Sequence, residues 1–414
     1  MSAGLLLFVE QHPASEAQEI LLREMLEIAR SAGHTISHVI SCRVRHPFPR
    51  YYFGKGKVKE IGDFVAEHSL GFVVTNVEVT PSQQRNLEEA WGVPVYTKYA
   101  VIHEIFAKRA RTAQGKIKVE LARLRYELSR LTGKGVELSR TGGGIGTRGP
   151  GEQKIEVERR KIRNRIAFLT RELQRIERQN ETQRTFRKRS GVFEVAIVGY
   201  TNAGKSTLLN ALTGADAYVM DQMFATLDPM ARKSFIPDVG EVVFIDTVGF
   251  VREMPETIKD AFRSTLEEVR DADLILEVVD VSDPDYVNHF RVVTETLEEI
   301  GASDCPRILV LNKIDLLDGL PFLEHDMRVQ PHVFVSAQKK IGIDKLYAEI
   351  ARLLQPQLTE VHLEIAPEKL KDITQRIRPH GYIKNLRALE DGTIVLDCVV
   401  QRDYVARLHA LLAS

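Results

Sequence analysis

Short apolar runs alternate with amphipathic stretches over residues 1–104. The apolar runs, which predict strands, are residues 5–9, 35–42, 71–75 and 93–96. The stretches between them, which predict helices, are residues 14–32, 56–68 and 81–91. Strands that alternate with helices commonly build a parallel sheet with helices on its faces. We therefore predict an N-terminal α/β domain over residues 1–104 with a mainly parallel sheet.

The next segment has the apolar period of two long paired helices. Two sets of apolar residues repeat with spacing 4, 3, 4, 3: Ile117, Leu121, Leu124, Leu128 and Leu131, then Ile162, Ile166, Leu169, Leu173 and Ile176. Between them, residues 132–151 contain eight glycines. We predict an antiparallel helical hairpin over residues 105–190, with a flexible Gly-rich tip at 132–151 and a basic linker at 184–189. At 1.5 Å per residue, each arm would reach roughly 35–45 Å.

Residues 192–356 return to the alternation of strands and helices. The predicted strands are residues 193–198, 242–246, 274–279, 307–311 and 333–336, and the predicted helices start at 205 or cover 256–272, 285–300 and 343–354. Residues 358–414 then follow the order strand, helix, strand, turn, strand, helix, with the turn at Asp391 and Gly392. The predicted fold class is thus multidomain α/β, with a small α+β domain at 358–414.

Composition places the chain among ordinary globular proteins. Apolar residues make up 43% and charged residues 28% of the chain, and no apolar run has the length of a membrane span. Residues 1–8 carry no basic segment of the kind that opens a signal peptide. Cys42, Cys305 and Cys398 are scattered and odd in number, which indicates no disulfide framework. We expect a cytoplasmic monomer.

The net charge of zero hides a strong polarity along the chain. Residues 108–190 contain 24 Lys and Arg against 9 Asp and Glu, and the remaining residues contain 33 against 48. A basic helical segment in an otherwise acidic chain favours a polyanionic partner such as RNA.

Residues 199–206 read G-x-x-x-x-G-K-S between a predicted strand and a predicted helix, which is the context of a phosphate-binding loop. Lys205 would reach the β- and γ-phosphates, and the Ser206 hydroxyl would bind Mg²⁺. The nucleotide-binding residues predicted here are Gly199, Tyr200, Thr201, Asn202, Ala203, Gly204, Lys205, Ser206 and Thr207.

Two further segments contain candidate groups for binding Mg²⁺ and the γ-phosphate. Asp246 follows a buried strand and can hold Mg²⁺ through water, and the Gly249 N–H can contact the γ-phosphate. Thr226 is the candidate switch threonine on Mg²⁺, although a solvated loop threonine is the alternative. The residues assigned to these segments are Phe224, Ala225, Thr226, Leu227 and Asp228, and Asp246, Thr247, Val248 and Gly249. The predicted catalytic residues are Lys205, Thr226, Asp246 and Gly249.

Residues 312–315 read N-K-I-D after the strand 307–311, which makes guanine the predicted base. The Asp315 carboxylate can accept hydrogen bonds from the ring N–H and the exocyclic amine of guanine, whereas adenine has no such pair of donors. The base-binding residues predicted here are Asn312, Lys313, Ile314 and Asp315, with Ser336, Ala337 and Gln338 in the closing loop. Residues 192–356 are therefore predicted to form a P-loop GTPase domain of the Ras-like fold, which binds GTP.

Two residues refine the predicted reaction. Phe250 stands where many GTPases place a glutamine that orients water, so we expect slow intrinsic hydrolysis. Asn202 is a candidate ligand for a monovalent cation such as K⁺, with a role in bracing the loop as the alternative.

Several segments together resemble the HflX family, in the Obg–HflX branch of phosphate-loop GTPases. They are residues 51–57 (YYFGKGK), 148–152, 199–206, 224–229, 246–250 and 312–315, and the resemblance covers essentially the whole chain. A switch without glutamine is typical of this family. The resemblance implies a GTPase that binds the large ribosomal subunit and helps to split stalled ribosomes under stress.

The hairpin agrees with such a partner, since Lys134, Arg140, Arg148 and Lys154 could contact RNA phosphates. A solvated spacer is the alternative for this segment. Residues 54–57 (GKGK) fit a helix start or an rRNA contact better than a second nucleotide site. A GTP-gated assembly or RNA-binding factor, and an ATP-dependent RNA-remodelling protein acting through residues 1–190, remain alternative functions.

Overall fold

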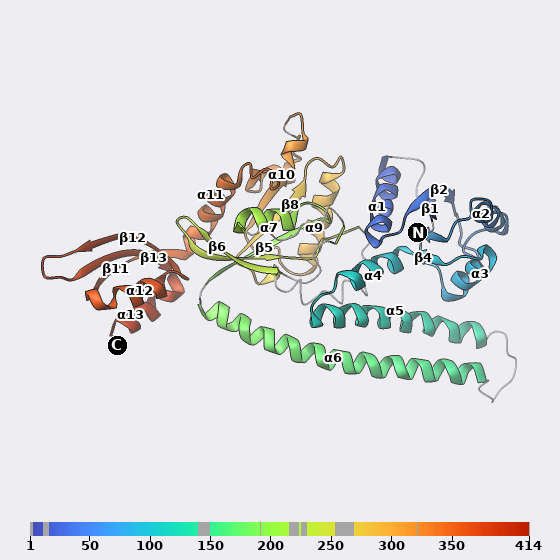
Figure 1. Ribbon diagram of the computed structural model, residues 1–414, viewed down its shortest axis with the longest axis horizontal. Coiled ribbons are helices and arrows are strands. Elements are labelled where there is room, and N and C mark those ends of the chain that lie inside the picture. Colours follow the sequence, from blue (N-terminus) through green and yellow to red (C-terminus); the bar gives the residue numbers. More distant parts are fainter. Residues whose placement is uncertain are drawn as a thin grey trace. The chain divides into compact units, whose positions relative to one another are not determined.

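The computed structural model describes residues 3–10, 16–139, 150–190, 192–214, 223–224, 230–252, 269–319 and 321–413 (Figure 1). These residues form two compact units, one within residues 1–174 and the other from residue 175 onwards. Over the described ranges, no helix is both long enough and apolar enough to cross a membrane.

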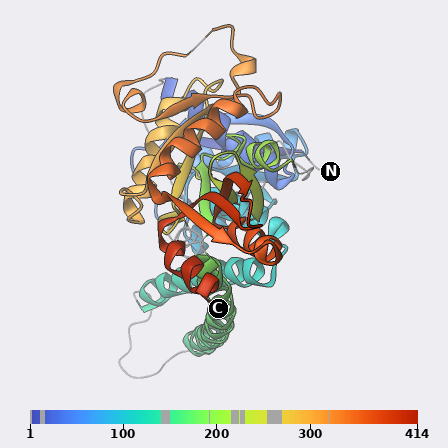
Figure 2. The same cartoon turned by 90° about the vertical axis from the view of Figure 1, so that its left-hand side faces the viewer.

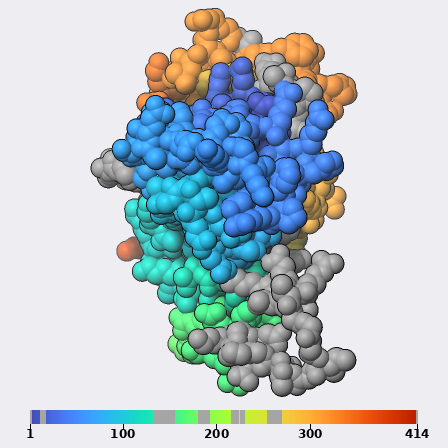
Figure 3. Space-filling view, turned by 90° about the vertical axis from the view of Figure 1, so that its right-hand side faces the viewer, coloured from blue at the N-terminus to red at the C-terminus, as the bar shows by residue number. Residues whose placement is uncertain are grey.

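The first unit begins with a parallel α/β domain, as the alternating pattern predicted. Its elements are β1 (Gly4–Glu10), α1 (Glu16–Ala32), β2 (Ile36–Arg43), α2 (Lys55–Glu67), β3 (Phe72–Thr75), α3 (Pro81–Trp91), β4 (Val95–Thr97) and α4 (Lys98–Arg109). The strand order is β2-β1-β3-β4, and every pair is parallel. The surface of this domain is drawn in blue to teal in Figure 3.

The core of this domain explains why the apolar runs became strands. Leu5, Leu7 and Val9 of β1 pack in one cluster with Ile61 of α2 and Leu87 of α3. The alternate β1 side chains are buried as well, so the strand is covered on both faces. Helices α1 and α4 contact each other and take the other side of the sheet.

Local sequence signals specify the bounds of some elements in this domain but not of others. Helix α3 begins with a capping box between Thr80 and Gln83 and ends at Gly92 with φ +70°, so its bounds match the prediction. Helix α4 was not predicted. It starts one residue after β4, with the Thr97 hydroxyl accepting from the Ala100 N–H, so no loop separates the two patterns.

Helices α5 (Ala113–Ser139) and α6 (Pro150–Ser190) form the predicted antiparallel hairpin. The seam buries Leu121, Leu124 and Leu169. Arg165 pairs with Glu120, and Arg159 donates to the carbonyl of Leu131 over 2.6 Å, so the two helices run in opposite directions.

Two predictions about the hairpin were wrong. The tip is shorter than 132–151, because residues 132–139 belong to α5 and residues 150–151 to α6. Residues 184–189 lie inside α6 and form no separate linker. The sequence has no glycine or proline from 152 to 190, so nothing interrupts the helix there. At 1.5 Å per residue, α6 is roughly 60 Å long, well beyond the predicted reach.

The second unit contains a six-stranded sheet. Its elements are β5 (Phe193–Gly199), α7 (Lys205–Thr213), β6 (Met230–Ile236), β7 (Gly240–Asp246), β8 (Leu274–Asp280), α9 (Tyr286–Glu299), β9 (Arg307–Asn312), α10 (His325–Arg328), β10 (His332–Phe334) and α11 (Ile343–Leu354). The order is β10-β9-β8-β5-β7-β6, and only the β6–β7 pair is antiparallel. The predicted helix at 256–272 falls largely outside the described residues.

Strand β6 and helix α10 were missed by the sequence prediction. Strand β6 is an edge strand in which most side chains are exposed, so it lacks the apolar run that marks a buried strand. Helix α10 has only four residues, too few for a period to be recognised.

The C-terminal residues follow the predicted order of elements. They form β11 (Leu358–Ile365), α12 (Leu370–Ile377), β12 (Gly381–Ala388), β13 (Ile394–Gln401) and α13 (Val405–Ala413). The strands pair antiparallel in the order β11-β13-β12, and both helices pack on one face of this sheet (Figures 1 and 2).

Candidate nucleotide-binding site

The phosphate loop leaves β5 at Gly199 and enters α7 at Lys205. A Cβ atom at Gly199 would lie 2.3 Å from the carbonyl oxygen of Val278, and one at Gly204 would lie 2.3 Å from Nδ2 of Asn312. Gly204 also has φ +95°. Both positions therefore require glycine, and the loop backbone stays close to the neighbouring strands.

Lys205 is 7% exposed at the start of α7. Its Nζ donates to the carbonyls of Gly199 (3.1 Å) and Tyr200 (2.8 Å). Burial lowers the pKa of Lys205 to about 8, partly offset by the Asp246 carboxylate. A phosphate bound beside this ammonium group would add negative charge and favour its protonated form.

Ser206 and Asp246 meet across the site. The Ser206 hydroxyl donates to Asp246 Oδ2 over 2.7 Å, and Asp246 is fully buried at the end of β7. A hydroxyl and a carboxylate are hard oxygen donors of the kind that Mg²⁺ uses when phosphate oxygens complete its shell. These two residues therefore fit a Mg²⁺ ion that neutralises phosphate charge.

The segment after Asp246 pairs with the phosphate loop. The Thr201 N–H donates to the Phe250 carbonyl over 2.8 Å, and the Phe250 N–H donates to the Gly199 carbonyl over 3.2 Å. Phe250 is 5% exposed, so its ring is packed within the protein. A phenyl ring can neither accept nor donate a proton, and this residue cannot act as a general base.

Asn312 joins the segment that was predicted to read the base to the phosphate loop. It is 2% exposed at the end of β9. Its Nδ2 donates to the Ala203 carbonyl over 2.9 Å, and its Oδ1 accepts from the Ala337 N–H over 3.0 Å. One side chain therefore fixes the loop at 336–338 and the phosphate loop together.

Lys313 and Asp315 are held by separate partners. Lys313 Nζ lies 2.7 Å from Asp280 Oδ2. A hydrogen bond from the Ser336 hydroxyl lowers the pKa of Asp315, and Lys339 lies 3.7 Å away and acts in the same direction. Asp315 is therefore ionised at neutral pH and can accept hydrogen bonds. Asp280 was missed, although its place at the end of an apolar strand is a usable signal.

The other predicted residues fall into two groups. The structure describes Tyr200, Thr201, Asn202 and Ala203 in the phosphate loop, Thr207 in α7, and Thr247, Val248 and Gly249 after Asp246, and it also describes Phe224, Ile314 and Gln338. The predicted residues Ala225, Thr226, Leu227 and Asp228, and the RNA-contact residues Arg140 and Arg148, lie outside the described residues. Lys134 lies in α5 and Lys154 in α6.

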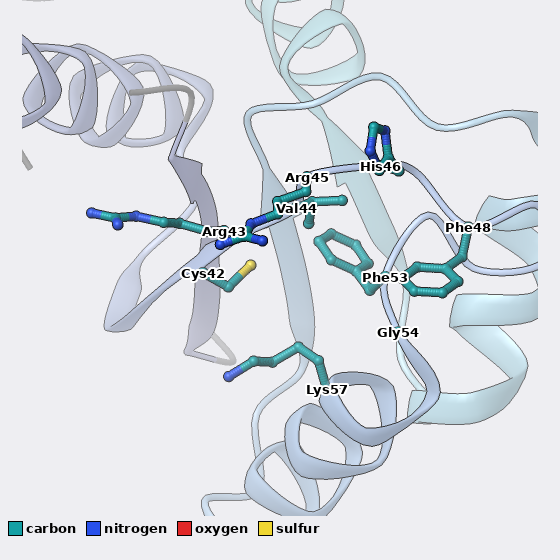
Figure 4. A pocket seen from close by; sticks show the side chains of 9 residues that line it. All are labelled: Cys42, Arg43, Val44, Arg45, His46, Phe48, Phe53, Gly54 and Lys57. Atoms are coloured by element: carbon teal, nitrogen blue, oxygen red, sulfur yellow. The ribbon is translucent and has the colours of Figure 1, made fainter. Parts of the chain in front are cut away.

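A small pocket in the N-terminal domain contains part of the GKGK segment, Gly54 and Lys57 (Figure 4). Gly54 is the N-cap of α2, which confirms the helix-start interpretation. The pocket is about 210 Å³ in volume. Two of its cationic side chains already pair with carboxylates, Arg43 with Glu10 at 2.6 Å and Lys57 with Glu60 at 2.8 Å. The two carboxylates reduce the positive charge that the pocket would offer to a triphosphate.

Family comparisons agree with this geometry. Residues 19–107 match the family described as GTP-binding GTPase N-terminal, residues 109–187 match GTP-binding GTPase Middle Region, and residues 194–313 match 50S ribosome-binding GTPase. The crystal structure of SsGBP in complex with GDP has 25% identity and a TM-score of 0.50, over 85% of this chain and 98% of that one.

Two curated relatives carry the same name. GTPase HflX of Caldanaerobacter subterraneus subsp. tengcongensis is 47% identical over 90% of this chain and 84% of its own length. GTPase HflX of Escherichia coli is 40% identical over 91% of this chain and 88% of its own. With a G-x-x-x-x-G-K-S loop, an N-K-I-D segment and relatives of this similarity over nearly its full length, the chain belongs to the HflX family of GTPases and is a GTP hydrolase.

Proposed function

We propose that this GTPase binds the large ribosomal subunit in the cytoplasm and, as a monomer, splits stalled ribosomes under stress. The observation that carries the proposal is the strongly basic helical hairpin in a chain that also holds a GTP site. Residues 108–190 have 24 cationic against 9 anionic residues. The match of residues 194–313 to a family described as 50S ribosome-binding GTPase supports the same partner.

In this proposal the nucleotide is held from three sides. Lys205 binds the β- and γ-phosphates, and Asp315 accepts hydrogen bonds from guanine. Ser206 and Asp246 hold Mg²⁺, with Thr226 added when the γ-phosphate is present. The 2.7 Å hydrogen bond between Ser206 and Asp246 supports the metal assignment, because it places a hydroxyl oxygen and a carboxylate oxygen next to each other. Gly249 would donate its N–H to the γ-phosphate.

The hairpin is the proposed RNA-binding element. Its cations outnumber its anions, so it would bind phosphates without reading bases. Lys134, Arg140, Arg148 and Lys154 are the proposed RNA-binding residues at and beside the tip. The buried seam of Leu121, Leu124 and Leu169 supports a stiff arm, which could present these residues to a partner at a distance from the seam.

Hydrolysis is expected to depend on the ribosome. Phe250 stands where a glutamine would orient the attacking water, and a phenyl ring cannot do so. The large subunit would therefore supply or position the missing group. GTP binding would favour the ribosome-bound state, and hydrolysis would end it.

Sedimentation of intact ribosomes with the protein tests the proposal. The protein is mixed with ribosomes and Mg²⁺, with GTP, GDP or a non-hydrolysable GTP analogue. We expect free subunits with GTP and with the analogue, and the protein should sediment with the large subunit. The control is the variant Ser206→Asn, which should remove the effect because it disturbs the proposed Mg²⁺ site.

Two other outcomes would point to different functions. Binding to large subunits without separation of intact ribosomes would support the alternative of a GTP-gated assembly factor. Absence of binding to either subunit with every nucleotide would reject the ribosome as the partner.

A further inference from the structure

The segment that follows Asp246 lies directly on the phosphate loop. Residues Tyr200 and Phe250 form a short parallel bridge, with hydrogen bonds of 2.8 Å and 3.2 Å on either side. Gly249 is consequently packed against the loop. A Cβ atom added to it would lie 2.7 Å from Cγ2 of Thr201 and 3.1 Å from Nζ of Lys205. Gly249 therefore lies close to Thr201 and to the ammonium group of Lys205, the group assigned to the γ-phosphate.

Arg252 ends this segment and ties it to α9. Its guanidinium forms an ion pair with the carboxylate of Asp285, and its backbone N–H donates to the Tyr200 hydroxyl over 3.0 Å. The Asp285 side chain is 3% exposed and that of Arg252 is 16% exposed. An ion pair this well buried is little screened by water and is costly to break one-sidedly.

Asp285 is itself held rigidly at the start of α9. Its Oδ1 accepts from Asn288 Nδ2 over 2.6 Å, and its backbone N–H donates to Asp283 Oδ1 over 2.8 Å. His289, one turn further along, lies 3.7 Å from Asp285 Oδ2. Helix α9 packs on the central strands β5 and β8, so the carboxylate stands on a fixed part of the domain.

Tyr200 completes a closed set of contacts with Arg252, Asp285 and His289. The imidazole of His289 stacks on the Tyr200 ring, with centroids 3.8 Å apart and planes at 12°. Tyr200 belongs to the phosphate loop, so Arg252 and His289 both connect α9 to the nucleotide-binding segments. Four side chains thereby join the phosphate loop, the segment 246–252 and α9 in one closed circuit.

We propose that Arg252 and Asp285 are a positioning pair that sets how strongly the chain prefers GDP over GTP. While the pair is formed, residues 247–252 stay bonded to the phosphate loop and Gly249 stays against Lys205. GTP has to move this segment to seat its γ-phosphate, whereas GDP does not. We call the Arg252–Asp285 pair the anchor of this segment. Part of the binding free energy of GTP is therefore used to loosen the segment from its anchor.

Arg252 and Asp285 do not touch the nucleotide under this proposal, and both act through the segment 247–252. The proposal rests on the assignment of residues 199–206 and 246–250 to the phosphates of GTP. Loss of the anchor should raise GTP affinity relative to GDP affinity by about tenfold, in the lower range of ordinary coupling between two sites.

The test is a double-mutant cycle on the full chain, with fluorescent GDP and a fluorescent non-hydrolysable GTP analogue as probes. The variants are Asp285→Asn, Arg252→Met and the double variant. Asp285→Asn keeps the oxygen that accepts from Asn288, which limits the structural disturbance. The control is Glu324→Gln, which removes the exposed ion pair between Arg291 of α9 and Glu324.

We expect the ratio of the dissociation constant for GDP to that for the analogue to rise about tenfold in each single variant. The double variant should show no further rise, because the two residues act as one unit. Glu324→Gln should leave the ratio unchanged. Thermal melting of each variant separates this effect from unfolding, which would weaken both nucleotides equally.

The proposal is overturned if folded anchor variants keep the parent ratio within about twofold, or if Glu324→Gln changes it as much. A parent chain that binds neither guanine nucleotide would overturn the site assignment itself, and the anchor with it. Failure of ribosome splitting alone leaves this measurement unaffected, so the two proposals fail separately.

Discussion

The side chain of Asn312 donates a hydrogen bond from Nδ2 to the carbonyl oxygen of Ala203 over 2.9 Å, across 109 positions of the sequence. The same side chain accepts from the Ala337 N–H over 3.0 Å. Asn312 is buried at the end of β9, so these bonds are shielded from water. The segments proposed to hold the phosphates and the base are therefore connected through Asn312, and a change at Asn312 should affect both.

Asn312→Ala should weaken GTP and GDP alike, by about tenfold or more, because it leaves the Ala203 carbonyl and the Ala337 N–H buried without this partner, at about 1–3 kcal/mol each. Asn312→Asp is the matched variant, because it keeps an acceptor for Ala337 and removes the donor to Ala203. Nucleotide titrations of both variants give the measurement. Parent-like affinity in both would mean that the bridge is not needed to form the site.

Asp315→Asn should move base preference from guanine toward xanthine. The amide donates where the carboxylate accepted, and xanthine carries a carbonyl where guanine carries its amine. Competition between GTP and XTP in a binding assay gives the ratio. A GTP/XTP ratio equal to that of the parent would reject Asp315 as the base-reading group. Asp318→Asn, three positions along and on an exposed residue, is the control.

Asn202→Gly tests the proposed K⁺ ligand. Asn202 has φ +63°, which glycine adopts without strain, so the substitution removes the amide and keeps the backbone. If the amide binds K⁺, exchange of K⁺ for Na⁺ should slow hydrolysis by the parent several-fold and leave the variant unchanged. The rate is measured at saturating GTP with large subunits present. Equal parent rates in the two salts would favour the role of Asn202 in bracing the loop.

Glu277 should make the stability of the second unit depend on pH. It is fully buried on β8, and burial raises its pKa to about 7, although Arg307 at 3.3 Å and Thr294 oppose the shift. Because the folded pKa lies above the unfolded one, the stabilising contribution is complete below about pH 4.5 and is lost as pH rises through about 7. The loss should be on the order of 3 kcal/mol.

Glu277→Gln should remove this dependence and flatten the melting temperature between about pH 5 and about pH 8, because an amide does not titrate in that range. Glu298→Gln, on an exposed position of α9, serves as the control and should keep the parent profile. If the melting temperature of the parent and that of Glu277→Gln change with pH in the same way over this range, Glu277 does not titrate as expected.

Replacing residues 140–149 with a short connection should leave GTP binding intact and abolish ribosome splitting. The seam around Leu121, Leu124 and Leu169 pairs the helices without help from the tip, so the hairpin should still fold. A Gly-Ser segment of the original length, without Arg140 and Arg148, separates length from charge. If the shortened protein split ribosomes at the normal rate, the hairpin would act only as a spacer.

Neutralising Lys134 and Lys154 should have a milder effect. Removing one cation that binds a phosphate should lower the slope of log affinity against log salt by about one. Binding to large subunits over a range of KCl concentrations gives that slope. An unchanged slope would place both residues away from RNA.

Features that depend on neighbours along the chain could be predicted from the sequence alone. The apolar period specified the hairpin seam, and Thr80, Gln83 and Gly92 specified both ends of α3. The phosphate loop was recognisable because its residues are consecutive in the sequence, although the close approach of Val278 to Gly199 and of Asn312 to Gly204 appears only in the folded protein. Backbone geometry and helix capping act over one or two turns, so the residues that determine them are neighbours in the sequence.

Features that depend on partners far along the chain emerged only in the folded protein. Strand β6 is a strand because β7 supplies its hydrogen bonds, although its own side chains are mostly exposed. The reach of Asn312 to Ala203 and the pairing of Arg252 with Asp285 exist because the sheet order places separate loops at one edge. Such pairings depend on how strands are ordered, and no local pattern in the sequence encodes that order.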